Sequence, residues 1–440
     1  MQPQDSQIFR LALPALGSLA AGPLYVLVDT AIVGHLGTEP LAGLALAGTL
    51  LDGVLALSNF LAYATTAQAG RQHAAGQIEA TKRLAAQALW LAAGLGLGMV
   101  VLGLAGGAAA VGLLGGSGSV ANLAALYLRI GVLGLPFALI ATAGQGFLRG
   151  MEDLRTPLVF IGGGNVANVV LEVVFVYAFG WGLAGSAWAT VIAQAGMGAG
   201  FILELWTASR GVRVPTLQAM RPLLRMGGQI FVRTAALYSA FIVASAVLAR
   251  IGAASLAAHQ VLFQLWMFLA LTLDAIAIAG QVMVSRALGR GDREEAAVAA
   301  ARMIGWSAVV GLACAALMLA FRDVLPRAFT SDPAVLDRAR VAWPVFALMQ
   351  PLNGAVFALD GILIGAGDSR YLMWSMLASA AVVVPLALLA LFTGSGIVGV
   401  WLAILALIVV RLATTGKRFL DRRWLVTGSL AIMGKLADPS

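Results

Sequence analysis

The chain has 440 residues and a formal net charge of +8; 60% of its residues are hydrophobic and only 11% are charged. A soluble domain carries about 25% charged residues, so this composition argues against a soluble enzyme and indicates an integral membrane protein. The Lys and Arg residues lie in short segments between apolar runs, a pattern that reports membrane orientation rather than a nucleic-acid-binding face.

Twelve apolar runs follow one another, each long enough to cross a bilayer as a helix of about 20 residues. Their approximate bounds are 8–33, 41–68, 84–109, 121–147, 156–178, 183–207, 224–250, 255–284, 297–321, 334–364, 371–393 and 397–415. Segments of about ten alternating apolar and polar residues, typical of membrane β-strands, do not occur. The predicted fold class is an all-α integral membrane protein with twelve transmembrane helices. We expect the first helix to be retained, because no signal-peptide cleavage pattern follows it.

The distribution of cations predicts the orientation in the membrane. If both termini are cytoplasmic, most Lys and Arg residues of the connecting segments fall on the cytoplasmic side. These are Arg71, Lys82, Arg83, Arg149, Arg155, Arg210, Arg213, Arg221, Arg225, Arg286, Arg290, Arg293, Arg370, Lys417, Arg418, Arg422 and Arg423. We therefore expect a multi-pass protein of the cell membrane, embedded in the lipid bilayer, with cytoplasmic N- and C-termini.

The two halves of the chain repeat at an offset of 215 residues. Residues 148–153 and 363–368 share the pattern Leu-x-Gly-x-x-Asp, and the same offset maps Pro136 onto Pro351. Six spans per half make both halves enter from the same side, as in transporters built from parallel repeats with a substrate cavity between the halves. The predicted organisation is an N-lobe at 1–207, a cytoplasmic linker at 208–222, a C-lobe at 223–424 and a C-terminal tail at 425–440.

Catalytic and nucleotide-binding motifs are absent from the sequence. It holds no GxxxxGK[ST] loop, its single Cys314 cannot form a CxxC site, and His35, His73 and His259 are isolated from one another. We therefore expect neither enzymatic activity nor a metal or organic cofactor. Energy for transport must come from an ion gradient or from a partner protein.

Ionisable residues inside the spans are the most informative ones, because each costs about 2.5–3.5 kcal/mol at the centre of a membrane helix and usually marks an ion or substrate path. Asp29 lies in the first span after Pro14 and Pro23, which remove backbone donors and can bend the helix. Ion or proton binding is the favoured role of Asp29. The alternative is a carboxylate that reaches out to the membrane surface near the end of the span.

The fifth span carries a second polar group. Asn168 and Glu172 are four residues apart, so both side chains project from one helix face and can share a proton or cation. A simple hydrogen bond between helices is the alternative interpretation. Gln145 and Thr190 are weaker candidate partners, because uncharged polar residues often only join helices.

The second half carries its own candidates. Asp360 stands where the repeat places Gln145, and Asp274 stands where it places Asn59. Arg233 is the only cation that the predicted spans place well inside the membrane. The alternative to a functional role is a buried structural pair between Arg233 and either Asp274 or Asp360.

Four segments resemble the multidrug and toxic compound extrusion (MATE) family, and within it the DinF-type branch. They are Val-Asp-Thr-Ala-Ile-Val-Gly-His-Leu-Gly at 28–37, Ala-Ala-His-Gln at 257–260, Leu-Asp-Ala-Ile-Ala-Ile-Ala-Gly-Gln at 273–281 and Asp-Gly-Ile-Leu-Ile-Gly-Ala-Gly-Asp at 360–368. The resemblance covers nearly the whole chain. It implies two six-helix lobes in a V, a central cavity open to one side at a time, and export of organic cations coupled to entry of H⁺ or Na⁺.

The resemblance also implies roles for single residues. The family's first-helix acid falls on Asp29 and its bending proline on Pro14. The fifth-helix pair falls on Asn168 and Glu172, and the supporting polar positions fall on Gln145 and Thr190. Prokaryotic relatives often have Asp and Asn where this chain has Glu172 and Gln145, which disfavours a compact Na⁺ site. The glutamate that other branches carry in the seventh span has no counterpart, and Arg233 lies in that span instead.

These observations predict a secondary antiporter that exports amphipathic, cationic drugs or toxins by alternating access. H⁺ is favoured as the coupling ion, with Na⁺ bound at Asp29, Asn168 and Glu172 as the alternative. We expect Asp29 and Glu172 to approach each other, and we expect the protein to act as a monomer. The runner-up function is a flippase for a lipid-linked precursor, whose cavity needs several cations for a pyrophosphate group. A membrane-embedded enzyme or receptor is the least favoured class, because no catalytic constellation is present.

Overall fold

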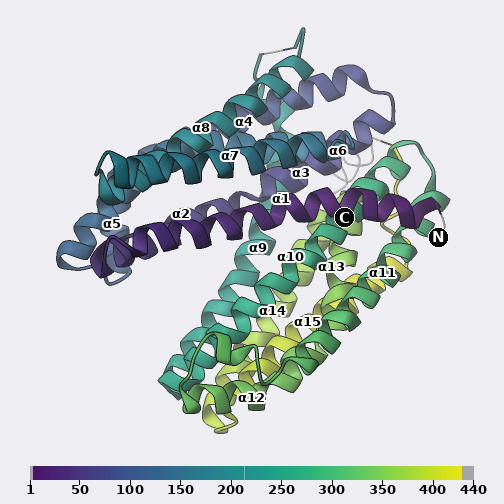
Figure 1. Cartoon of the computed structure of the whole chain (residues 1–440). Helices are drawn as coiled ribbons and strands as arrows, with labels where there is room; N and C mark the ends of the chain where they lie inside the picture. Colours follow the sequence, from purple (N-terminus) through teal and green to yellow (C-terminus); the bar gives the residue numbers. More distant parts are fainter. Residues whose placement is uncertain (1–2, 213, 429–440) are drawn as a thin grey trace. The chain divides into compact units, whose positions relative to one another are not determined.

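The computed structural model of the protein describes residues 3–212 and 214–428, so Arg213 and residues 429–440 of the predicted tail lie outside the described residues. The described chain is helical and contains no strand (Figure 1). Within it, 11 helices are long and apolar enough to cross a membrane, or up to 12 if one bent pair counts as a single span. The predicted all-α membrane fold is confirmed.

The first half of the chain forms six spans, three of them single helices and three interrupted or extended. They are α1 (Pro3–Gly34), α2 (Thr38–Ser58) with α3 (Phe60–Ala74), α4 (Ile78–Leu113), α5 (Gly118–Gly131) with η1 (Val132–Gly134) and α6 (Leu135–Gly150), α7 (Arg155–Val173) with the π-helical turn η2 (Val174–Ala178), and α8 (Gly182–Ala208). Asn59 separates α2 from α3. α1 continues through both of its prolines, Pro14 and Pro23.

The second half repeats this order of helices. It comprises α9 (Leu217–Ile251), α10 (Ala253–Gly289), α11 (Arg293–Ala320), the short η3 (Pro326–Ala328), α12 (Pro333–Leu348), α13 (Gln350–Gly365), α14 (Ser369–Phe392) and α15 (Gly396–Leu420). α12 and α13 form the bent pair, at an angle of 48°. Pro351 lies in the first turn of α13 and has no N–H to continue the hydrogen-bond ladder of α12, which explains the bend.

The structure confirms the internal repeat. Four helix starts of the first half reappear in the second half at the predicted offset of 215 residues: Thr38 and Ala253, Ile78 and Arg293, Gly118 and Pro333, and Leu135 and Gln350. Tight packing is repeated as well. Gly146 on α6 lies against the carbonyl of Ala62 on α3, and Gly361 on α13 lies against the carbonyl of Ala277 on α10. A side chain larger than hydrogen does not fit at either crossing, so the glycines allow the two helix backbones to touch.

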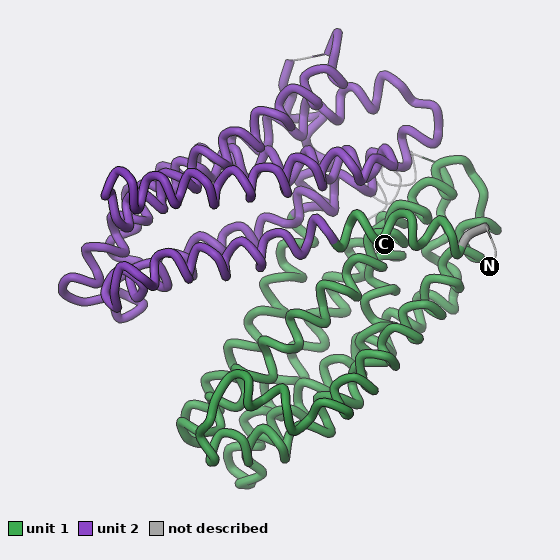
Figure 2. Tube along the Cα trace, viewed as in Figure 1, with its two compact units in different colours: residues 1–16, 228–440 green, residues 17–227 purple. Residues whose placement is uncertain are grey.

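The helices form two compact units (Figure 2). The N-unit is Gly17–Gly227, and the C-unit is Met1–Leu16 with Gly228–Ser440. The C-unit therefore includes the first turns of α1, which differs from the predicted N-lobe at 1–207. Contacts with α10 and α11 explain the difference: Trp306 donates to Asp5 (2.9 Å), the rings of Phe9 and Trp306 meet edge to face with centroids 4.9 Å apart, and Arg286 donates to Gln7 (3.2 Å).

The segment that joins the two repeats is shorter than the predicted linker at 208–222. α8 ends at Ala208 and α9 begins at Leu217, inside the predicted linker. The buried Gln87 of α4 holds this segment to the N-unit by two hydrogen bonds of 3.1 Å, one to the carbonyl of Val214 and one from the N–H of Thr216. The end of the connection is therefore fixed to a helix of the N-unit.

Candidate functional site

One face of α1 carries the contacts that build the candidate site in the N-unit. Its positions are spaced three or four residues apart, so they fall on one side of the helix. The contacts are Asn165 to the carbonyl of Ala21 (3.0 Å), Tyr25 with Thr190 (2.8 Å), Ser186 to Asp29 (2.7 Å) and Tyr177 to the carbonyl of Ile32 (2.9 Å). All the partners lie on α7, η2 and α8, so α1 is held to these elements along about three turns.

Asp29 is buried within the N-unit, with 5% of its surface exposed. Its Oδ1 atom accepts a hydrogen bond of 2.7 Å from the hydroxyl of Ser186, which is itself fully buried. The carboxylate is therefore enclosed by protein and does not reach out to the membrane surface as the alternative interpretation required.

Glu172 lies on α7 beside Asp29, as the sequence predicted. The two carboxylates interact electrostatically, and Ser186 is the other polar neighbour of Glu172. Glu172 is fully buried, and neither of its carboxylate oxygens has a hydrogen-bond partner among the described residues. Val166 and Val170 on the opposite face of α7 are exposed. The helix thus turns its polar face toward protein and its valines outward, as expected for a membrane helix that lines a functional site.

Asn168 and Thr190 complete the cluster. Asn168 donates a long hydrogen bond of 3.4 Å to the hydroxyl of Thr190, while its own Oδ1 is buried without a partner in the described chain. Tyr127 of α5 interacts with the hydroxyls of Thr190 and Ser186. We name Asp29, Glu172, Asn168, Ser186 and Thr190 the acidic cluster.

The chemistry of the acidic cluster suits a proton or a small hard cation. It offers two carboxylates and an amide oxygen, and oxygen is the donor that such ions prefer. No group of three or more His, Cys, Asp or Glu side chains that could hold a metal ion occurs in the part of the chain that the structure describes.

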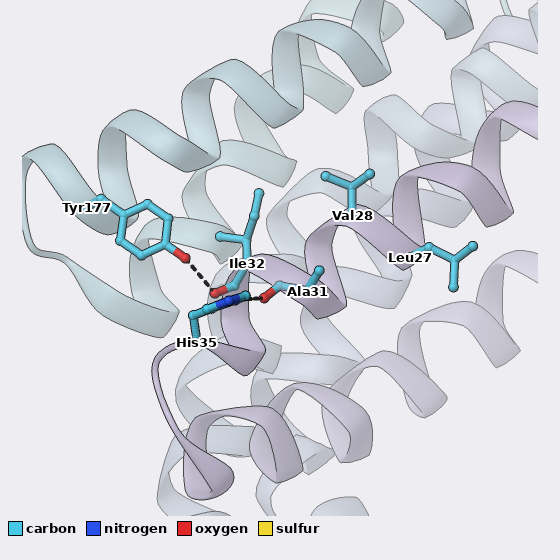
Figure 3. Close-up of a pocket in the computed structure, with 6 residues that line it drawn as sticks. All are labelled: Leu27, Val28, Ala31, Ile32, His35 and Tyr177. Atoms are coloured by element: carbon cyan, nitrogen blue, oxygen red, sulfur yellow. Dashed lines mark hydrogen bonds between the residues drawn. The ribbon is translucent and has the colours of Figure 1, made fainter. Parts of the chain in front are cut away.

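Two pockets open near the acidic cluster. The first, of about 380 Å³, lies along the last turns of α1 and is lined by apolar side chains together with His35 and Tyr177 (Figure 3). His35 donates to the carbonyl of Ala31 (2.7 Å) and Tyr177 to that of Ile32, so both polar side chains are engaged with α1. The pocket wall thus presents mainly apolar surface.

The second pocket, of about 240 Å³, lies between α2, α6 and α8. Its lining residues are Leu55, Ala56, Asn59, Ala138, Ala141, Thr142, Gln194 and Met197. Gln194 follows Thr190 by four residues and Met197 follows by seven, so the same face of α8 joins the acidic cluster to this pocket. We name it the α2–α6–α8 pocket.

Gln145 is the predicted partner that the structure does not link to the acidic cluster. It lies on α6, one turn after Thr142, and no hydrogen bond shown for the described residues joins it to Asp29, Asn168 or Glu172. Its predicted supporting role stays a prediction.

The C-unit brings two members of the predicted second group into contact. Asp360 on α13 pairs with Arg233 on α9 and with Arg411 on α15. Asp274, the third acidic or basic candidate of this half, lies on α10. Arg411, which the sequence analysis does not single out, is 2% exposed and lies within α15, which continues five residues beyond the predicted end of the span.

Sequence reasoning missed Ser186, Tyr127 and Arg411. The signal for Ser186 was present, since it precedes Thr190 by four residues on one helix face. The signal for Arg411 was a single cation between apolar residues of the last span. Tyr127 had no distinguishing signal, because its position depends on how α5 packs against α8.

Comparison with known proteins agrees with this architecture. The profile of the MatE family matches residues 14–174 and 230–389, one segment in each repeat. The chain is 30% identical to Protein DETOXIFICATION 44, chloroplastic, of Arabidopsis thaliana, over 92% of this chain and 80% of that protein. It is 29% identical to DNA damage-inducible protein F of Escherichia coli (strain K12), over 86% of this chain and 84% of that protein.

Solved structures of other proteins have a similar fold. A crystal structure of MATE in the bent conformation is similar with a TM-score of 0.88, at 21% sequence identity, and the match covers 99% of this chain and 98% of that chain. The family profile covers well over half of the chain, and the fold matches the solved MATE structure over nearly its whole length. The chain therefore belongs to the MatE family and is a multi-pass membrane transporter.

Proposed function

We propose that this transporter is a proton-coupled antiporter that exports amphipathic organic cations by alternating access. The observation that carries the proposal is the burial of Asp29 and Glu172 side by side, with the hydroxyl of Ser186 next to both acids. Two carboxylates that share a buried site cannot both stay ionised unless a proton or cation neutralises one of the charges. The pair therefore binds either the coupling ion or the cationic substrate.

If a proton and an organic cation compete for this pair of carboxylates, the result is antiport. A bound proton removes one negative charge and weakens the attraction for an organic cation, and by linkage a bound cation weakens proton binding by the same factor. H⁺ is favoured over Na⁺ because a proton needs only the two carboxylates. A metal cation needs a larger set of converging oxygen ligands.

The α2–α6–α8 pocket supports amphipathic substrates. Its lining combines apolar Leu55 and Met197 with the amides of Asn59 and Gln194, a mixture that accepts apolar ligands with a few polar groups. The relatives named multidrug resistance proteins, such as NorM of Thermotoga maritima at 23% identity, are consistent with this substrate class. We further propose that the protein lies in the cell membrane as a monomer with both termini in the cytoplasm, as its cation distribution indicates.

The test is ion-driven transport by the purified protein in proteoliposomes, with the membrane potential clamped and ethidium as the fluorescent cation. A pH gradient at equal Na⁺ is expected to drive ethidium flux, and a Na⁺ gradient at equal pH is not. Glu172→Gln is expected to abolish the flux, whereas the matched variant Glu204→Gln, an acid on α8 outside the acidic cluster, is expected to retain it. Flux driven only by the Na⁺ gradient would overturn proton coupling, and no flux under either gradient would overturn the antiporter.

A further inference from the structure

Three buried charges meet inside the C-unit. Arg233 of α9 and Arg411 of α15 both donate, each through its Nη2 atom, to the same Oδ2 oxygen of Asp360 on α13. The exposed fractions of the three side chains are 12% for Arg233, 8% for Asp360 and 3% for Arg411. We name these residues the Arg–Asp–Arg triad.

The triad carries one positive charge more than it carries negative charge. Uncompensated charge inside a membrane span is costly, and where it is retained it usually marks an ion or substrate path. α15 carries another ion pair two turns further along, where Arg418 pairs with Asp368 (2.7 Å).

The guanidinium groups have N–H donors that Asp360 does not use. A guanidinium group has five N–H donors in a planar fork, and each arginine of the triad uses Nη2 for Asp360. The Nε atom of Arg233 is buried and has no hydrogen-bond partner within the described chain. Arg233 is also the more exposed of the two arginines, so its side chain is the accessible edge of the triad.

We propose that the Arg–Asp–Arg triad binds one carboxylate group of an organic anion, which Arg233 holds through its spare donors and Arg411 stabilises by its charge. A carboxylate fits because it is planar and accepts two parallel hydrogen bonds from one guanidinium group. The excess of a single positive charge matches a monocarboxylate. It does not match a pyrophosphate group, which carries several negative charges.

This site extends the ligands of the transporter beyond cations. It lies wholly in the C-unit, whereas the acidic cluster lies wholly in the N-unit, so the two proposals stand on different residues. The transporter would accept anionic or amphoteric solutes at the triad whichever ion drives transport.

The test is isothermal titration of the purified full-length protein in detergent, at low chloride, with benzoate and with its neutral analogue benzamide. Benzoate is expected to bind at least about tenfold more tightly than benzamide, the scale of hydrogen bonds to a charged group. Asp29→Asn changes the acidic cluster and not the triad, so it is expected to leave benzoate binding unchanged. This variant separates a failure of the benzoate site from a failure of proton coupling.

Variants of the triad are expected to change benzoate affinity in opposite directions. Arg233→Gln brings the net charge to zero and weakens binding by about tenfold or more, whereas Asp360→Asn removes the competing carboxylate and strengthens binding by a similar factor. Arg250→Gln, an exposed charge at the end of the same α9 helix, is the matched control and is expected to bind like wild type. Size-exclusion profiles and thermal unfolding check that each variant is folded.

Two results would overturn the proposal. One is the absence of benzoate binding in both the wild type and Asp360→Asn. The other is equal benzoate affinity in the wild type and in folded Arg233→Gln. If Arg233→Gln does not fold, the benzoate affinity of Asp360→Asn becomes the deciding measurement. An affinity of this variant equal to that of the wild type would reject the site.

Discussion

Ser186 on α8 donates a hydrogen bond of 2.7 Å to Asp29 on α1, and the same side chain lies beside Glu172 on α7. A hydroxyl that donates to a carboxylate favours its ionised form. Asp29 has this donor, whereas neither oxygen of Glu172 has a hydrogen-bond partner among the described residues. The two acids therefore have different environments.

Ser186→Ala is expected to shift the pH dependence of transport. The pair of Asp29 and Glu172 loses the hydroxyl that contacts both acids, a hydrogen bond worth about 1.5–3 kcal/mol, so the pH of half-maximal ethidium efflux is expected to change by about one unit or more. The measurement is efflux from proteoliposomes across pH 5 to 9. Ser58→Ala removes a buried hydroxyl that bonds only within its own helix, and it is the control expected to keep the wild-type profile. An unchanged profile in Ser186→Ala would show that the serine does not tune the pair.

Glu172 can be tested by shortening its side chain while keeping its charge. Glu172→Asp brings a shorter, more compact carboxylate to the same helix face. We expect this variant to retain proton-driven transport and to gain dependence on Na⁺, measured as ethidium flux driven by a Na⁺ gradient at fixed pH. The absence of Na⁺-driven flux in Glu172→Asp would show that side-chain length is not what excludes Na⁺.

The sequence was sufficient to predict the helices and their repeat. Twelve apolar runs gave the spans, and the offset between Pro136 and Pro351 gave the repeat, because hydrophobic length and turn residues are local properties. The division of α1 between the two units could not be predicted in this way. It depends on contacts such as Trp306 with Asp5, which join residues about 300 positions apart in sequence.

In the candidate sites, too, local spacing could be predicted and contacts between distant helices could not. Asn168 and Glu172 were predictable as one helix face because their spacing decides it. The approach of Glu172 to Asp29 was predicted because both acids were expected to face the cavity of the same half of the chain, and the bond from Ser186 was not predicted. Arg411 stands four residues before the predicted end of the last span, where a cation is ordinary, so its burial could not be predicted from the sequence.

Helix packing at the repeated glycines predicts a loss of stability. Gly146→Ala places a methyl group against the carbonyl of Ala62, and Gly361→Ala places one against the carbonyl of Ala277. Overpacking of this kind costs about 1–3 kcal/mol, so we expect each variant to unfold at a lower temperature than the wild type. Gly162→Ala on α7 is the control, because a methyl group there meets nothing within 4 Å. Unchanged thermal unfolding of both variants would mean that these helix crossings are loose.

The α2–α6–α8 pocket predicts an effect on substrate size. Met197→Trp fills part of its volume of about 240 Å³, so binding of a large cation such as ethidium is expected to weaken by about tenfold, while a small cation such as tetramethylammonium is affected less. Fluorescence anisotropy of ethidium and competition by the smaller cation measure the two affinities. Met267→Trp, an exposed methionine in the C-unit, is the control. Equal loss for both cations would place the substrate elsewhere.

Proton release on substrate binding tests the central claim most directly, because antiport requires the organic cation to displace a proton from the pair formed by Asp29 and Glu172. The measurement adds ethidium to purified protein in a weakly buffered solution near pH 7 and follows a pH-sensitive dye. We predict about one proton released per ethidium bound by the wild type and none by Asp29→Asn or Glu172→Gln. Binding without proton release in the wild type, or undiminished release in both variants, would contradict the account.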